Sequence, residues 1–351
     1  MSDSLIIEID GKIGRIRLNR PAALHALTTA MCLGIIDALA AFENDDAVEA
    51  VVFDHAPSPD GDPKKSRGFC AGGDIRMLAE SGKSDGREAR AFFQAEYRMN
   101  HRLFTYMKPT VAIMDGITMG GGVGIALPCQ YRVATENTRL AMPETGIGLF
   151  PDVGGGWYLP RLPRNVGMFL ALTGARLDGA ECLAVGLATH YLAAADVPDA
   201  LTALSTNADD IASTLKSYGT GAPIARVVES RTHIDRLFAA DSVTAIMAAL
   251  ETDGSAWAAK ELTTMRTKSP LSMAVAFRQL REGAAMPDFA AEMRQEYAIG
   301  ARVVHTKDFI EGVRALIIDK DNAPQWQPHI DPAEVDAIFA PLPAGEEWTP
   351  L

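Results

Sequence analysis

The chain has 351 residues, of which 48% are hydrophobic and 22% charged, a composition typical of a protein that folds around a core. Its formal net charge of -12 at pH 7 argues against a broad surface for nucleic acid or for an anionic membrane, because both need clustered Lys and Arg. We therefore expect neither a nucleic-acid nor a membrane partner, and an anionic ligand would have to be held by local groups.

The cysteines and histidines indicate neither a disulfide framework nor a metal site. The seven histidines form no HxxxH or HExxH pattern, and no GxSxG motif or evident catalytic triad is present. The chain starts without the basic and apolar regions of a signal peptide, and no apolar run reaches the roughly 18 residues of a membrane span. We therefore expect a reducing, cytoplasmic location. The four cysteines are far apart and have no zinc-ligand spacing: Cys32, Cys70, Cys129 and Cys182.

The first half of the chain predicts strands that alternate with helices. It opens with β-branched residues around the turn Asp10-Gly11, which indicates a hairpin. Thr28 can cap the first helix, and its apolar residues recur on one face to about Glu43. This alternation implies an α/β fold with crossover connections. The expected elements are a hairpin over 5–18, helices over 28–43, 88–106 and 120–127, and strands over 48–55, from 110, and near 131–134 and 139–142.

The second half of the chain reads differently. Beyond about Ala193 the strand patterns fade and helical periodicity replaces them. We therefore expect an α/β region over 1–193 and a helical region over 194–351. Helices are expected over 208–216, 224–239, 243–252, 256–267, 271–283, 288–305 and 309–318.

Two glycine-rich segments have the composition of an oxyanion site. In one, Ala71, Gly72 and Gly73 precede a helix expected to begin near Asp74, and in the other a glycine run over 120–122 follows a strand. Small residues let backbone N–H groups approach a ligand, and a helix start leaves such groups unpaired. Each segment alone is more simply a tight turn. Two of them raise the prospect that N–H groups converge on one developing oxyanion.

Glu96 lies in an apolar stripe of its expected helix. Phe92, Met99 and Leu103 fall on the same side at helical spacing. A carboxylate in such a place is costly unless it is hydrogen-bonded or faces a cavity. The alternative is an edge position paired with a basic residue, because every helical stripe has edges.

Two further acids, Glu144 and Asp152, stand in the stretch AMPETGIGLFPDVGGGWYLP (141–160). Eight positions separate them, with no Lys or Arg between. If they point inward, they would be poorly solvated and have a raised pKa, which suits a general acid or base. The Pro and Gly residues around them are equally compatible with an exposed loop.

Together these motifs resemble the crotonase, or enoyl-CoA hydratase/isomerase, superfamily. Within it, FPDVGGG, the Glu96-Tyr97 pair and KDFIEGVRALIIDKDNAPQW (307–326) resemble the 3-hydroxyisobutyryl-CoA hydrolase branch. The similarity spans nearly the whole chain. It implies a spiral of ββα units followed by a helical C-terminal region, with a bent CoA thioester held across the first half. The motifs that carry the wider resemblance are RLNRPAALHALT (17–28), GFCAGGDI (68–75), GITMGGGVGIAL (116–127) and MPETGIGLFPDVGGG (142–156).

The resemblance also implies roles for individual residues. The N–H groups of Ala71 and Gly121 match the superfamily's oxyanion donors, which would join the two glycine turns into one site. Glu144 falls on its retained catalytic glutamate. The remaining matches are expected to contact the substrate: Glu96, Gly72, Gly73 and Asp74, with Asp152 as a second catalytic acid.

One departure from the superfamily bears on the reaction. Hydratases carry a second glutamate a few residues after the glycine run, and this chain has Gly124 there. Glycine cannot act as acid or base, so the resemblance favours thioester hydrolysis of a short 3-hydroxyacyl-CoA, as in valine degradation. Two alternatives stay open: a hydratase or isomerase in which Asp152 is the base, and a CoA-binding protein without catalysis.

The resemblance has consequences for ligands and assembly too. No cofactor is expected beyond the CoA of the substrate, whose phosphates Lys64, Lys65 or Arg67 could contact. Members of the superfamily form trimers or dimers of trimers, so a homo-oligomer is possible, although the extended C-terminal region could change the assembly.

Overall fold

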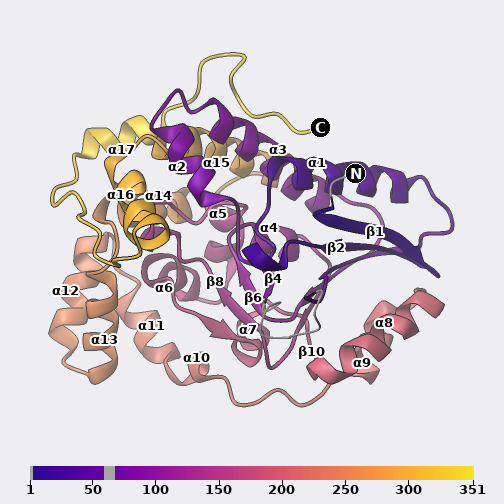
Figure 1. The fold of residues 1–351 in the computed structure, drawn as a ribbon. Helices are drawn as coiled ribbons and strands as arrows, with labels where there is room; N and C mark the ends of the chain where they lie inside the picture. The colour runs from indigo at the N-terminus through magenta and orange to yellow at the C-terminus, as the bar shows by residue number, and fades with distance from the viewer. Residues whose placement is uncertain (1–2, 59–67) are drawn as a thin grey trace.

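The computed structural model describes residues 3–58 and 68–351 (Figure 1). The basic residues suggested as phosphate contacts, Lys64, Lys65 and Arg67, lie outside the described residues. Their role therefore stays a prediction.

Two sheets form the N-terminal half of the chain. The larger has six strands in the order β1-β2-β3-β5-β7-β10, and the smaller has four in the order β4-β6-β8-β9. The expected hairpin is confirmed as the antiparallel pair β1 and β2, and β2 continues into parallel pairing with β3. The strands are β1 (Leu5–Asp10), β2 (Ile13–Leu18), β3 (Ala50–His55), β4 (Gly68–Cys70), β5 (Thr110–Met114), β6 (Ile117–Met119), β7 (Tyr131–Ala134), β8 (Arg139–Ala141), β9 (Leu177–Asp178) and β10 (His190–Tyr191).

Three consecutive units share one plan: the first strand joins the large sheet, the second strand joins the small sheet, and a helical segment follows. The units are β3-β4 with α2 (Ile75–Gly82) and α3 (Arg87–Phe104), β5-β6 with α4 (Gly121–Ala126), and β7-β8 with the short 3₁₀ helix η2 (Glu144–Gly146). Strands β4, β6 and β8 pair in parallel, so their carboxyl ends meet at one edge of the small sheet. The expected spiral of ββα units is confirmed, and it brings three distant segments of the chain together.

The six-stranded sheet is buried on both faces, which follows from alternation along its strands. In β3, Val51 and Phe53 join the main apolar cluster, whereas Ala50 and Val52 join a second cluster on the opposite face. Leu201 and other residues of α8 (Val197–Thr206) and α9 (Ile211–Ser217) cover that second face.

The helical C-terminal region is confirmed, with differences in detail. The helix expected over 224–239 is two helices, α10 (Arg226–Glu229) and α11 (Arg231–Leu237). Both apolar clusters contain residues from either side of residue 193, and the division there stays a prediction. The other expected helices are α12 (Val243–Asp253), α13 (Ala256–Met265), α14 (Pro270–Gly283), α15 (Phe289–Val303) and α16 (Lys307–Val313), the last extended by a π-helical turn (Arg314–Ile318).

Several helices were not predicted from the sequence pattern. The helix α6 (Val166–Thr173) is apolar on almost all sides and buried, so it has no amphipathic period to detect. The start of α7 (Gly179–Val185) did carry a readable signal, because Asp178 and Glu181 form a capping box. Three others were missed: α5 (Gly155–Tyr158), α8 and α17 (Pro332–Phe339).

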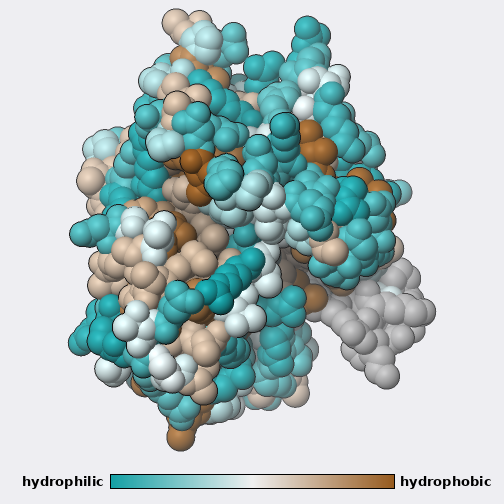
Figure 2. All heavy atoms as spheres, turned by 90° about the vertical axis from the view of Figure 1, so that its left-hand side faces the viewer, coloured by the Kyte–Doolittle hydropathy of each residue, from teal (hydrophilic) through white to brown (hydrophobic). Residues whose placement is uncertain are grey.

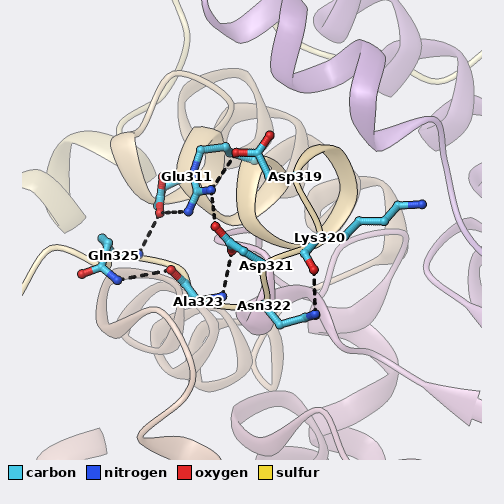
Figure 3. A network of polar contacts seen from close by, with 8 residues as sticks. Glu311, Asp319, Lys320, Asp321, Asn322, Ala323 and Gln325 are labelled. Atoms are coloured by element: carbon cyan, nitrogen blue, oxygen red, sulfur yellow. Dashed lines mark hydrogen bonds and ion pairs between the residues drawn. The ribbon is translucent and has the colours of Figure 1, made fainter.

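A network of hydrogen bonds and ion pairs around one arginine stabilises the segment over 319–325 that follows α16 (Figure 3). Arg314 donates hydrogen bonds to Glu311 and Asp319, each at 2.8 Å, and to Asp321 at 2.6 Å. Glu311 in turn accepts from the backbone N–H of Gln325 at 2.8 Å. These contacts explain how a motif rich in charge, within 307–326, forms a fixed turn.

The face shown in Figure 2 is hydrophilic over most of its upper part, and pale-brown, moderately hydrophobic residues gather in its lower left part. In the described ranges, no helix combines the length and the apolar character needed to cross a bilayer.

Candidate active site

A small cavity of about 70 Å³ lies where the turns after β4, β6 and β8 meet α3. The spiral brings the predicted residues together here, with one exception. Asp74 does not line the cavity; its carboxylate caps α2 by accepting from the N–H of Met77 at 3.3 Å. The predicted residues that do line it are Ala71, Gly72, Gly73, Glu96, Gly121, Glu144 and Asp152.

The two glycine turns approach each other as closely as backbones can. A Cβ on Gly120 would stand 3.2 Å from the Cα of Gly72, and Gly120 has a φ of +46°. Only glycine adopts such a conformation and tolerates such an approach without strain. Because α4 begins at Gly121, the N–H of this residue has no partner within the helix. Among the described residues it has no hydrogen-bond partner, so it is an available donor at the cavity wall.

Ala71 was expected to supply the second donor, and the structure does not support that assignment. Its N–H donates to the backbone carbonyl of Leu24 at 3.0 Å, in a turn where Leu24 has a φ of +48°. An N–H that is already paired cannot bind an oxyanion without breaking that bond. The next two residues, Gly72 and Gly73, have N–H groups without a hydrogen-bond partner among the described residues, so they are the better placed donors.

The three acids are all buried at the cavity: Glu96 is 2% exposed, Glu144 4% and Asp152 5%. Asp152 accepts a hydrogen bond from the hydroxyl of Tyr97 at 2.9 Å. One oxygen of Glu96 and one of Glu144 have no partner in the part of the chain that the structure describes. The sequence pattern left burial open against a helix edge for Glu96 and an exposed loop for the other two acids, and the structure shows all three buried.

Two of these carboxylates flank the glycine turn. The Oε1 of Glu96 lies 2.6 Å from where a Cβ on Gly121 would stand, and the Oε1 of Glu144 lies 3.5 Å from the same point on Gly120. Any side chain at Gly121 would displace Glu96. The carboxylates and the N–H of Gly121 therefore surround one small volume.

Burial raises the pKa of all three acids, because a charge in this setting is poorly solvated. The pKa of Asp152 rises to about 7, although the hydrogen bond from Tyr97 opposes the shift. The pKa values of Glu144 and Glu96 rise well above the ordinary range, chiefly through burial and then through the charge of Asp152. Three acids coupled in this way are not all ionised at neutral pH, so the site can hold a proton and a base together.

Glu296 of α15 anchors the loop that carries Asp152. Glu296 accepts from the N–H of Gly154 at 2.8 Å and from that of Gly156 at 3.1 Å, and Gln279 donates to Glu296 at 3.1 Å. Val153, between Asp152 and Gly154, has a φ of +54°, which is a strained conformation for a β-branched residue. Sequence reasoning missed Glu296; its only signal was a carboxylate on the apolar face of the expected helix over 288–305.

The turn that carries Glu144 is held by α14. The N–H of Ser269, just before that helix, donates to the carbonyl of Thr145 at 3.0 Å, and the N–H of Leu149 donates to the carbonyl of Glu144 at 3.0 Å. Residues from the helical half of the chain thus fix both loops that carry the acids of the cavity.

The position of Gly124 is closed to any larger residue. A Cβ there would stand 2.7 Å from the Cβ of Val153 and 2.7 Å from the Nδ2 of Asn100. Both neighbours are packed in place, because Asn100 also donates to the carbonyl of Gly124 at 3.0 Å. A glutamate at position 124 therefore does not fit this packing.

The fold and this site define a class that sequence comparison confirms. The chain belongs to the enoyl-CoA hydratase/isomerase family, whose family profile matches residues 13–339.

More specific similarity points to particular relatives. The chain is 44% identical to the 3-hydroxyisobutyryl-CoA hydrolase, mitochondrial, of Danio rerio, over 96% of this chain and 90% of that protein. It is 40% identical to the protein of the same name from Homo sapiens, over 93% and 85%. Among solved structures, a carnitinyl-CoA dehydratase from Mycobacterium thermoresistibile matches with a TM-score of 0.92 and 37% identity over 99% of both chains. The names of these relatives cover more than one reaction, so the site itself has to distinguish between them.

Proposed function

We propose that the protein hydrolyses the thioester of a short 3-hydroxyacyl-CoA, with 3-hydroxyisobutyryl-CoA as the first candidate. The observation that carries this proposal is the packing around Gly124. Val153 and Asn100 fill the space where hydratases place their second glutamate. The hydratase arrangement, with a second glutamate at position 124 beside Glu144, therefore has no room here, whereas Glu144 keeps an oxygen without a partner among the described residues.

The proposed reaction uses groups that line one cavity. The N–H of Gly121 and an N–H of the Gly72-Gly73 turn stabilise the negative charge that develops on the thioester oxygen. Glu144 either attacks the carbonyl carbon, giving a mixed anhydride that water then cleaves, or removes a proton from the attacking water. In both routes the C–S bond breaks and CoA leaves as the thiol after taking up a proton.

Asp152 and Glu96 are the groups proposed to position the acyl hydroxyl or the water. Asp152, whose pKa is raised to about 7, can accept a hydrogen bond when ionised and donate one when protonated. The cavity of about 70 Å³ suits a short acyl group. A polar partner is needed there, because a hydroxyl in an apolar pocket without one is costly.

A panel of acyl-CoA esters tests the proposal directly. The panel contains 3-hydroxyisobutyryl-CoA, 3-hydroxypropionyl-CoA, isobutyryl-CoA, which lacks the hydroxyl, and the unsaturated methacrylyl-CoA. Free thiol and loss of the conjugated double bond are followed in parallel. We expect thiol release from both hydroxyacyl esters, a rate with isobutyryl-CoA lower by roughly tenfold or more, and no hydration of the unsaturated ester.

Each competing function has its own outcome in this assay. Loss of the double bond without thiol release would identify a hydratase. Binding of every ester without turnover would identify a CoA-binding protein that lacks catalysis. Equal rates with isobutyryl-CoA and 3-hydroxyisobutyryl-CoA would keep the hydrolase but remove the proposed hydroxyl contact.

The cellular location and the assembly stay proposals. The proposed location is the cytoplasm, whereas the relatives from Danio rerio and Homo sapiens carry a mitochondrial name. A trimer would follow the wider superfamily, and light scattering on the purified protein measures it.

A further inference from the structure

A second and larger cavity, of about 630 Å³, lies against the turn that carries Glu144. Pro143 and Ile147 line both cavities, so this turn forms a wall between them. The other walls come from α6, β9, α7, α10, α11 and α13. None of these elements contributes to the reaction proposed above.

The charges in this cavity do not balance. Among its lining residues, Arg226 pairs with Glu181 at 3.3 Å and Lys260 pairs with Glu261 at 3.2 Å. Two further cations line the cavity, Arg176 and Lys268, and neither has an ion pair within residues 3–58 and 68–351. In a chain with a net charge of -12, two cations that line one cavity and have no ion pair of their own among the described residues indicate a place for an anion.

Lys268 is also the more confined of the two. Its Nζ lies 3.5 Å from where a Cβ on Gly146 would stand and 3.7 Å from the same point on Gly174. The ammonium group therefore lies against the backbone of both glycines. Burial and the nearby charge of Arg176 lower the pKa of Lys268, as expected for a cation that lacks a counter-ion.

The rest of the cavity suits a ring-bearing molecule. Phe169 and Trp257 line it with ring centroids 5.8 Å apart, and Val227 and Leu316 add apolar surface. Aromatic side chains beside cations form the usual environment for a flat ring attached to a charged group. The volume lies within the range of roughly 300–1,000 Å³ that small-molecule sites occupy.

From the unpaired cations and the aromatic wall we infer that this cavity binds a phosphorylated organic ligand such as a nucleotide. Arg176 and Lys268 would hold the phosphate, because a phosphate group carries about two negative charges at neutral pH and matches two unpaired cations. The ring would rest against Trp257. This site is separate from the catalytic cavity, and the inference does not depend on the proposed reaction.

A ligand bound in this cavity could affect the turn that carries Glu144, because Lys268 is joined to that turn through the next residue. Lys268 is followed by Ser269, whose N–H holds the carbonyl of Thr145 at 3.0 Å, next to Glu144. A ligand that draws Lys268 toward its phosphate would move this anchor. We therefore expect a bound nucleotide to change kcat more than KM.

Calorimetric titration of the full chain with pyrophosphate and with ADP, at low ionic strength, tests the inference. We expect both probes to bind, with ADP tighter because of its ring. Lys268→Met keeps the length of the side chain and removes the charge, and it should weaken pyrophosphate binding roughly tenfold or more. Lys216→Met is the matched control, since Lys216 is exposed on α9, and binding should stay unchanged.

The outcomes separate clearly. No heat of binding with either probe at millimolar concentration, or equal binding by Lys268→Met and the control, would overturn the inference. If Lys268→Met does not fold, Arg176→Met, at an exposed residue, provides the same test. A third titration adds saturating CoA: displacement of ADP assigns the site to the nucleotide part of CoA, and undisturbed binding assigns it to a free nucleotide. Both results support a phosphate site.

Discussion

Two buried glutamates, Glu296 and Glu144, differ in the groups that surround their carboxylate oxygens. Glu296 is fully buried, and each of its oxygens accepts at least one hydrogen bond, from Gly154, Gly156 and Gln279. Glu144 is also buried but keeps an oxygen without a partner at the cavity wall. Burial raises the pKa of both residues.

This comparison shows why a raised pKa does not by itself mark a catalytic acid. Glu296 holds a loop, because the donors that surround it are fixed backbone N–H groups. Glu144 has an oxygen left over for substrate or water, beside free N–H donors of a glycine turn. Two features distinguish a structural acid from a candidate catalytic acid: whether its oxygens all accept hydrogen bonds within the protein, and whether one of them faces a cavity.

The largest expected effect comes from Glu144→Gln. The substitution removes the base or nucleophile and keeps the shape, so thioester hydrolysis should fall by roughly 10²–10⁴-fold. The protein should stay folded, because a neutral amide is easier to bury than a carboxylate. Thiol release and the melting temperature are the measurements, and Glu80→Gln, at an exposed residue of α2, is the control. Full hydrolase activity in Glu144→Gln would contradict the assignment of the catalytic residue.

Asp152→Asn should separate activity from stability. Activity should fall by roughly 10–10²-fold, because the amide cannot exchange a proton. The folded pKa of Asp152, about 7, lies above its unfolded value, so the native state binds the extra proton between about pH 4 and 7. The carboxylate therefore costs stability as pH rises through this window. Chemical denaturation at pH 4.5 and pH 8 should show a gain for Asp152→Asn at the higher pH only; an equal effect at both would refute the shift.

Glu296→Gln should give the opposite pattern to Glu144→Gln. One of the two backbone N–H groups would face an NH₂ instead of an oxygen, so unfolding should become easier by about 1–3 kcal/mol. Activity should fall less than in Glu144→Gln, because the loop that carries Asp152 would lose an anchor and the carboxyl group of Asp152 would move. Denaturant titration and thiol release measure the two effects. A variant as stable as the wild type, but inactive, would place Glu296 among the catalytic groups.

The limits of the sequence follow from the same residues. The residue pattern alone raised only the prospect that the two glycine turns converge, because each is also compatible with a tight turn; the resemblance to the superfamily joined them into one site. The sequence could not show which N–H in the run over 71–73 is free, since that depends on the left-handed turn at Leu24, which lies in a separate motif (17–28) and has no local signal for this contact. Glu296 was missed because its partners are backbone groups 140 and 142 residues away, and no local pattern records them.

The smallest expected effect concerns the pKa of Asp152, which the hydroxyl of Tyr97 lowers. The hydroxyl of Tyr97 donates to Asp152 at 2.9 Å and opposes the rise of its pKa. Tyr97→Phe removes this bond and keeps the ring, so the pKa of Asp152 should rise further. The acidic limb of the pH profile of kcat/KM should move to higher pH by up to about one unit, with little change in rate above it. Tyr106→Phe, which loses a hydrogen bond to the carbonyl of Leu39 instead, should leave the profile in place. An unmoved profile in Tyr97→Phe would mean that Asp152 does not titrate in the catalytic cycle, and the acid that limits the reaction at low pH would then be Glu144 or Glu96.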